Sequence, residues 1–184
     1  MSWEALSKRH SGMALLQSSD ALVTMVIAVG MGTAAVIDLR TRRIPNILTA
    51  TLAAVGIGLA AAGLGRIGLG AALLGCLLGL AFMLPGHIFG ATGAGDVKLL
   101  AAAGALLGPN DTIYAFLYTA IAGGVLALGV AVARRRFAQT MTSAGRLVSG
   151  GEQARAEIES TSSDNRFAYA PAIAIGVVLV ALSW

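Results

Sequence analysis

Residues 21–37 read ALVTMVIAVGMGTAAVI, an unbroken run that contains no charged side chain. A transmembrane helix needs about 20 largely apolar residues, and this run has the length and composition of one. It is followed at 38–46 by DLRTRRIPN, in which an acid and three arginines come at once. We therefore predict that a helix crosses a membrane here and that Asp38 lies at its boundary.

The rest of the chain has the same apolar character. Only 12% of its 184 residues are charged, whereas soluble domains carry about 25%, and the mean hydropathy is +0.79. A soluble chain of this length buries roughly 70% of its unfolded surface, which would leave too much apolar surface in water. The composition therefore predicts an all-α, polytopic membrane bundle, whose 24 glycines let helices approach closely.

Six apolar segments can be distinguished along the chain. We expect about six transmembrane helices, at 21–37, 46–64, 68–89, 97–108, 112–133 and 167–184. Residues 1–20 are predicted as an N-terminal tail that could form an interfacial helix, and 21–184 as the membrane domain. The polar segment 134–166 is predicted to be a loop on the cytoplasmic side.

The basic residues indicate the orientation. Alternating loops place most of them on one side: Arg40, Arg42, Arg43, Lys98, Arg134, Arg135, Arg136, Arg146, Arg155 and Arg166. The opposite side carries Arg66, and the N-terminal Lys8 and Arg9 are outnumbered. The positive-inside rule therefore assigns the first group to the cytoplasm. The net charge of +4 then reports orientation, and no nucleic-acid partner is expected.

Two acids stand apart from the others, which lie in predicted tails or loops. Asp38 ends the first predicted span and Asp96 begins the fourth, so both fall at the same membrane boundary. Acids at such a depth are costly and tend to be functional. A close carboxylate pair shares one proton, so one member can activate water while the other donates a proton. Such chemistry needs no metal, no cofactor and no nucleophilic Ser or Cys.

A simpler interpretation is that each aspartate caps a helix and pairs with a nearby Arg or Lys. The glycines before Asp96, in GATGAGD at 90–96, favour a functional site. Glycine permits close backbone approach, so an extended peptide could lie beside the acid. The order of these glycines is not that of a dinucleotide-binding loop. The single cysteine, Cys76, can form neither an intramolecular disulfide nor a four-cysteine zinc site.

Two motifs in this order, DLRTRRIPN at 38–46 and GAGDVKLL at 93–100, resemble the type IV prepilin peptidase family of GxGD-type membrane aspartyl proteases. In that family one aspartate lies in a D-x-R/K…I-P-N setting and the other in G-x-G-D-x-K. The resemblance implies that Asp38 and Asp96 are catalytic. It implies supporting or substrate-contacting roles for Gly93, Gly95, Lys98, Arg40, Pro45 and Asn46.

The last span is similar to the closing helix of that family. FAYAPAIAIG at 167–176 has its P-Y-G-x-A-like start, although Ala168 stands where proline is common. Larger members carry a four-cysteine zinc motif and methylate the new amino terminus. With one cysteine this chain resembles the short Flp/Tad-type form, for which methyltransferase activity is not expected.

The resemblance also implies a substrate and a location. The substrate would be a membrane-inserted prepilin with a basic leader, cut on the cytoplasmic side of the bacterial inner membrane. The lipid bilayer is the other expected partner, and the oligomeric state is left open. Three alternatives remain: a proton-coupled transporter with acids nearer the midplane, a non-catalytic subunit of a pilus or secretion assembly, and a presenilin-like protease, whose Y-D and P-A-L motifs are absent in that form.

Overall fold

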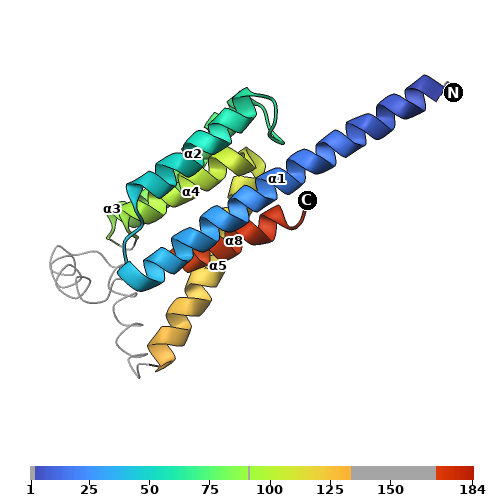
Figure 1. Cartoon of the computed structure of the whole chain (residues 1–184). Coiled ribbons are helices and arrows are strands. Elements are labelled where there is room, and N and C mark those ends of the chain that lie inside the picture. The colour runs from blue at the N-terminus through green and yellow to red at the C-terminus, as the bar shows by residue number, and fades with distance from the viewer. Residues whose placement is uncertain (1–2, 91, 134–168) are drawn as a thin grey trace.

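The computed structural model describes residues 3–90, 92–133 and 169–184, and over these residues the chain consists of helices joined by short turns and loops. The helices are α1 (Trp3–Thr41), α2 (Asn46–Ala61), α3 (Leu69–Ile88), α4 (Ala94–Leu107), α5 (Pro109–Ala133) and α8 (Ala170–Ala181) (Figure 1). The all-α prediction is thus confirmed, with a helix at each of the six predicted spans. The predicted loop at 134–166 lies outside the described residues.

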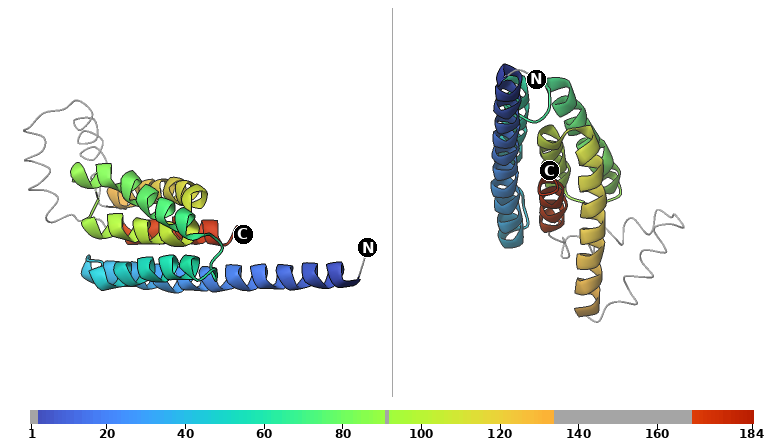
Figure 2. Two further views of the ribbon diagram at one scale, coloured as in Figure 1. Left: turned by 90° about the horizontal axis from the view of Figure 1, so that it is seen from above. Right: turned by 90° about the vertical axis from the view of Figure 1, so that its right-hand side faces the viewer.

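The helices stack in three layers (Figure 2). The first layer holds α1 and α2, the middle layer α4 and α8, and the third layer α3 and α5, with neighbouring layers in direct contact. Because α4 is covered on both sides, nearly every residue from Asp96 to Leu107 is buried. The short length of this helix follows from that position, since it is enclosed by protein rather than by lipid.

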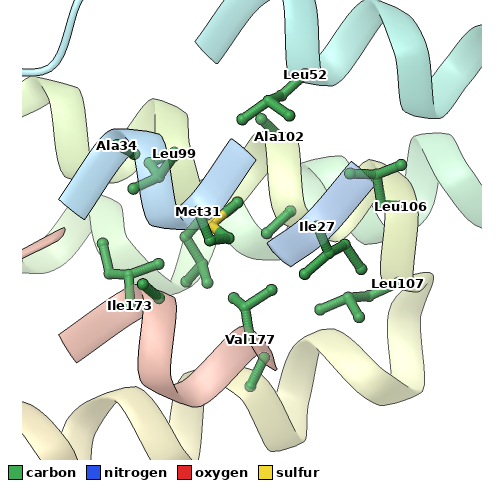
Figure 3. Packing of buried hydrophobic residues seen from close by; sticks show 14 of the residues in the cluster. Ile27, Met31, Ala34, Leu52, Leu99, Ala102, Leu106, Leu107, Ile173 and Val177 are labelled. Carbon is green, nitrogen blue, oxygen red and sulfur yellow. The ribbon is translucent and has the colours of Figure 1, made fainter. Parts of the chain in front are cut away.

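The first layer is attached to the middle layer by an apolar stripe on α1. Val23, Ile27, Met31 and Ala34 recur every three or four residues, so they lie on one face of the helix, and all are buried. They pack toward α4 and toward α8 (Figure 3). This stripe fixes which face of α1 points inward.

Glycines set the distance between α3 and α4. A Cβ added to Gly75 would fall on the carbonyl oxygen of Gly104, and one added to Gly104 would fall on the carbonyl oxygen of Gly75. The two backbones therefore touch, as in the small-residue interfaces of membrane helices, where van der Waals packing drives association. Only glycine at both positions permits this crossing.

The outer surface is apolar. Three stretches are long and apolar enough to cross a membrane, Asp20–Thr41, Leu69–Ile88 and Pro109–Gly129, while α2 and α8 are shorter apolar helices. Large side chains such as Met25, Val29 and Val125 are more than 60% exposed on these helices. A soluble monomer rarely exposes so much apolar surface, so the fold is that of a helical membrane bundle.

Two boundaries differ from those predicted. Residues 3–20, predicted as part of a tail that could form an interfacial helix, are helical and continue α1, which projects beyond the other helices (Figures 1 and 2). Helix α4 begins at Ala94, so the glycine-rich interruption is shorter than the predicted 90–96. Gly90 has a left-handed φ of 76° and Gly93 is the N-cap, which is sufficient to end one helix and begin the next.

A polar cluster ties the helices together at the end of the bundle remote from Asp38. Arg66 Nε lies 3.0 Å from Asp20 Oδ1, and a terminal guanidinium nitrogen lies 3.5 Å from Asp111 Oδ2. The Trp184 indole N–H donates to Asp111 Oδ2 at 2.9 Å, and the guanidinium stacks 3.8 Å from that ring. From the sequence Arg66 was assigned only to the side opposite the basic group, and its pairing with Asp20 and Asp111 was not predicted.

The α3–α4 contact predicts the effect of one methyl group. Replacing Gly75 with Ala should lower the free energy of unfolding by about 1–3 kcal/mol, because the helices must separate or strain. Gly58→Ala is the control, since an added Cβ there meets no atom within 4 Å, and it should be neutral or stabilising by up to about 1 kcal/mol. Unfolding by SDS titration in mixed micelles measures both. Equal stability of the two variants would contradict the close crossing.

Candidate active site

Asp38 continues the inward-facing stripe of α1. It follows Ala34 by four residues, about one helical turn, and is therefore carried to the same face. Its exposure is 6%. The helix ends immediately afterwards, where Arg42 takes a left-handed φ of 52° and its N–H donates to the Asp38 carbonyl oxygen at 2.8 Å. The carboxylate is thus buried in the last turn of α1.

A backbone donor from the far end of the chain meets this carboxylate. The N–H of Ala170, at the start of α8, donates to Asp38 Oδ2 at 3.1 Å in a buried hydrogen bond. The first N–H groups of a helix have no partner within the helix, so a carboxylate placed there satisfies one of them and is itself stabilised. The contact joins α1 to α8.

Asp96 lies in the first turn of α4. Its Oδ2 accepts the Gly93 N–H at 2.9 Å, as a carboxylate at this position does in a capping box. A Cβ on Gly93 would lie only 3.2 Å from the same oxygen. Asp96 is 7% exposed. The glycine therefore makes room for the acid and also supplies its hydrogen-bond donor.

The two carboxylates lie at the same end of the bundle, where α1 ends and α4 and α8 begin. Both side chains are buried there, and each accepts a backbone N–H at the start of a helix. The structure thus brings together the two acids that the sequence singled out from motifs more than 50 residues apart.

The second glycine of the motif has a different role. A Cβ on Gly95 would lie 3.0 Å from the Cβ of Ile44, in the segment between α1 and α2. Any larger residue at 95 would push that segment away from α4. Gly95 therefore lets the two motifs touch.

Lys98 and Asn46 make a second contact between the motifs. Lys98 Nζ donates to Asn46 Oδ1 at 2.9 Å, from α4 to the first residue of α2. Pro45 precedes Asn46 as the N-cap residue of α2 and is exposed, as is Arg40 in the last turn of α1. Of the predicted supporting residues, Lys98, Asn46, Gly93 and Gly95 thus make contacts within the motifs.

An apolar groove runs along the first layer beside this site. It encloses about 410 Å³ between α1 and α2. On α1 it reaches Thr33, little more than one turn before Asp38, and on α2 it begins at Leu48, close to Pro45. The groove therefore extends from the predicted membrane interior toward the acids.

Sequence reasoning missed the contribution of Ala170. The predicted start of the last span, FAYAPAIAIG at 167–176, contains Tyr169 and Pro171, and Pro171 does lie in the first turn of α8. The group that reaches Asp38 is the amide of the residue between them. Almost every residue type carries a backbone N–H, so the sequence does not show which amide acts as a donor. Only the proline, which is common in the first turn of a helix, indicated that a helix with free N–H groups begins there.

These features define an integral membrane helical bundle with a buried pair of acids at one end. The profile of the type IV leader peptidase family matches residues 25–128, more than half of the chain. The chain belongs to this family and is a peptidase, and both aspartates fall within the matched region. No curated protein and no solved structure matches the chain.

The contact between the two motifs can be tested without reference to activity. In a Cys76→Ala background, Ile44→Cys with Gly95→Cys should form a disulfide under mild oxidation, because 3.0 Å between the Cβ positions needs only a small shift to reach disulfide geometry. Loss of two maleimide-reactive thiols, read by mass, measures it.

The control pairs Ile44→Cys with Gly58→Cys, which lies roughly 18 Å along α2 from its start. Equal crosslinking of the two pairs would contradict the arrangement.

Proposed function

We propose that this chain is a membrane aspartyl endopeptidase that removes the leader peptide of type IV or Flp-type prepilins at the cytoplasmic membrane boundary, with Asp38 and Asp96 as its catalytic pair. One observation carries the proposal. In a chain of the leader peptidase family, two buried carboxylates from separate helices lie at the same end of the bundle, where each accepts a backbone N–H at a helix start.

The mechanism follows from a shared proton. The ionised carboxylate takes a proton from water, whose oxygen attacks the scissile carbonyl carbon, while the protonated carboxyl donates to the carbonyl oxygen. The resulting diol collapses as the C–N bond breaks. The amine nitrogen takes the proton that came from water, and the other carboxylate regains its proton from the diol. One water is consumed, and the pair returns to its starting state.

In this proposal the surrounding contacts hold the two carboxylates in fixed positions relative to each other. The Gly93 and Ala170 amides each hold one carboxylate, and Gly95 and the Lys98–Asn46 hydrogen bond join the two motifs. A displacement of about 1 Å can cost roughly 10²-fold in rate. In this proposal these residues, together with Pro45, position the site, and the exposed Arg40 is available to the substrate.

The groove between α1 and α2 supports a membrane-inserted substrate. It is apolar, lies on the membrane-crossing part of α1, and approaches the acids at Thr33 and Leu48. The hydrophobic segment of a prepilin could lie in it with the peptide bond before that segment near Asp38. Its lining ends at Thr33 on α1 and at Leu48 on α2, which are the lining residues nearest to Asp38 and Pro45 along the chain.

The charges support a cytoplasmic site. Arg40, Arg42, Arg43 and Lys98 gather at the end that carries both acids. At the opposite end Arg66 is paired with Asp20 and Asp111, so it adds little net positive charge there. The positive-inside rule then assigns the acid-bearing end to the cytoplasm of a bacterial inner membrane.

The other candidate functions have less support. A proton relay would favour acids near the bilayer midplane, whereas these two lie in the last turn of one helix and the first turn of another. A non-catalytic assembly subunit would have no need of two buried carboxylates, which are costly to retain without a use.

Asp38→Asn and Asp96→Asn should each reduce cleavage of a co-expressed prepilin by about 10³-fold or more, because neither amide can shuttle a proton. The mass of the pilin measures the loss of its leader. Asp20→Asn at the opposite end is the matched control and should cleave normally. Wild-type cleavage by Asp38→Asn protein, at equal expression, would exclude the mechanism.

The orientation has its own test. In a Cys76→Ala background, Thr41→Cys should react with a membrane-impermeant maleimide only after the cells are opened, whereas Leu64→Cys should react in cells whose inner membrane is intact. The reverse pattern would place the acids on the outer face.

A further inference from the structure

The first turn of α8 lies between Asp38 on α1 and helix α5 of the third layer. Tyr169 is the N-cap residue of α8, and its carbonyl accepts the N–H groups of Ala172 and Ile173 at 3.0 and 3.2 Å. The next residue, Ala170, donates its own N–H to Asp38. Whatever fixes the backbone of Tyr169 therefore also fixes the donor that Asp38 receives.

The side chain of Tyr169 is seated on α5. A Cβ added to Gly123 would lie 2.5 Å from Tyr169 Oη and 2.7 Å from Cε2 and Cζ. The phenol ring thus lies directly on the backbone of α5, in a notch that exists only because residue 123 has no side chain. Gly123 is buried, and its neighbour Gly124 is exposed with no atom within 4 Å of an added Cβ.

Tyr169 therefore links two parts of the bundle. Its backbone precedes the amide that Asp38 receives, and its ring lies on Gly123 of α5, which belongs to neither motif.

We propose that Tyr169, locked against Gly123 of α5, is a positioning residue for the catalytic pair: the seated ring sets the first turn of α8 and so holds the Ala170 amide on Asp38. This inference rests on the proposed peptidase function. It assigns a role to the α5–α8 contact and requires no contact between the tyrosine and the substrate.

Two glycine variants test the proposal on the full-length protein in lipid nanodiscs with a purified prepilin. Gly123→Ala should lower kcat by about 10²-fold, since the methyl displaces the ring and with it the amide, and should leave KM within about twofold. Gly124→Ala is the matched control on the same helix, with the same gain in helix propensity, and should keep wild-type kcat.

Two tyrosine variants distinguish the ring from the hydroxyl. Tyr169→Ala should match Gly123→Ala, and Tyr169→Phe, which keeps the ring, should retain kcat within about threefold. A purely structural role would instead lower the melting temperature and the amount of active protein without this division between kcat and KM.

Several outcomes would overturn the assignment. Equal kcat for Gly123→Ala and Gly124→Ala would show that the seat does not position the pair. Loss of kcat in Tyr169→Phe equal to that in Tyr169→Ala would make the hydroxyl a catalytic group. If the wild-type protein leaves the prepilin intact, the proposed function fails and the inference falls with it. If the wild-type protein cleaves the prepilin and both glycine variants keep wild-type kcat, only the inference about Tyr169 is overturned and the proposed function stands.

Discussion

The hydrogen bond from the Ala170 amide to the Asp38 carboxylate is the interaction on which the arrangement of the site depends. A buried carboxylate is costly unless a donor satisfies it. Here the donor comes from a helix whose sequence position is 132 residues away. The bond holds the last turn of α1 against the first turn of α8, and both lie beside the beginning of α4. Asp96, whose carboxylate accepts the Gly93 N–H, is buried at the same end of the bundle.

Close backbone packing makes this convergence possible. Glycines lie where α4 meets α3, at Gly75 and Gly104, and where it meets the segment before α2, at Gly95. In a membrane, helices gain little from burying apolar side chains against one another, so van der Waals contact between backbones contributes more. Close backbone packing at glycines thus both stabilises the bundle and allows the two motifs to touch. The GxGD motif therefore has a structural reason for each glycine: Gly93 donates to the acid, and Gly95 admits Ile44.

Much of the fold could be predicted from sequence because apolar run length reports membrane helices directly. The span predicted at 46–64 begins at the residue where α2 begins, and the span at 68–89 differs from α3 by one residue at each end. The continuity of residues 3–20 with α1 could not be predicted, because this stretch mixes polar and apolar residues and contains no apolar run of membrane length. The burial of α4 on both sides could not be predicted either, because a helix that is apolar all round can be enclosed by protein or can face lipid.

In the candidate site, too, some groups could be predicted from the sequence and others could not. Asp38 and Asp96 were found because acids are rare in apolar sequence and their surroundings form motifs. The Ala170 amide and the Gly123 seat were not found, because a backbone donor and an absent side chain show their role only in three dimensions. The cluster around Arg66 was missed because its partners Asp20, Asp111 and Trp184 are far apart along the chain.

The most direct test of the account is the binding of a non-cleavable prepilin to the protein in nanodiscs. In one analogue a hydroxyl-bearing tetrahedral carbon replaces the scissile carbonyl, and in the other a methylene does. If Asp38 and Asp96 hold the tetrahedral intermediate together, the hydroxyl analogue should bind at least about 10²-fold more tightly, and Asp38→Asn or Asp96→Asn should abolish that preference. Equal affinity of the wild-type protein for both analogues would contradict the paired-aspartate mechanism.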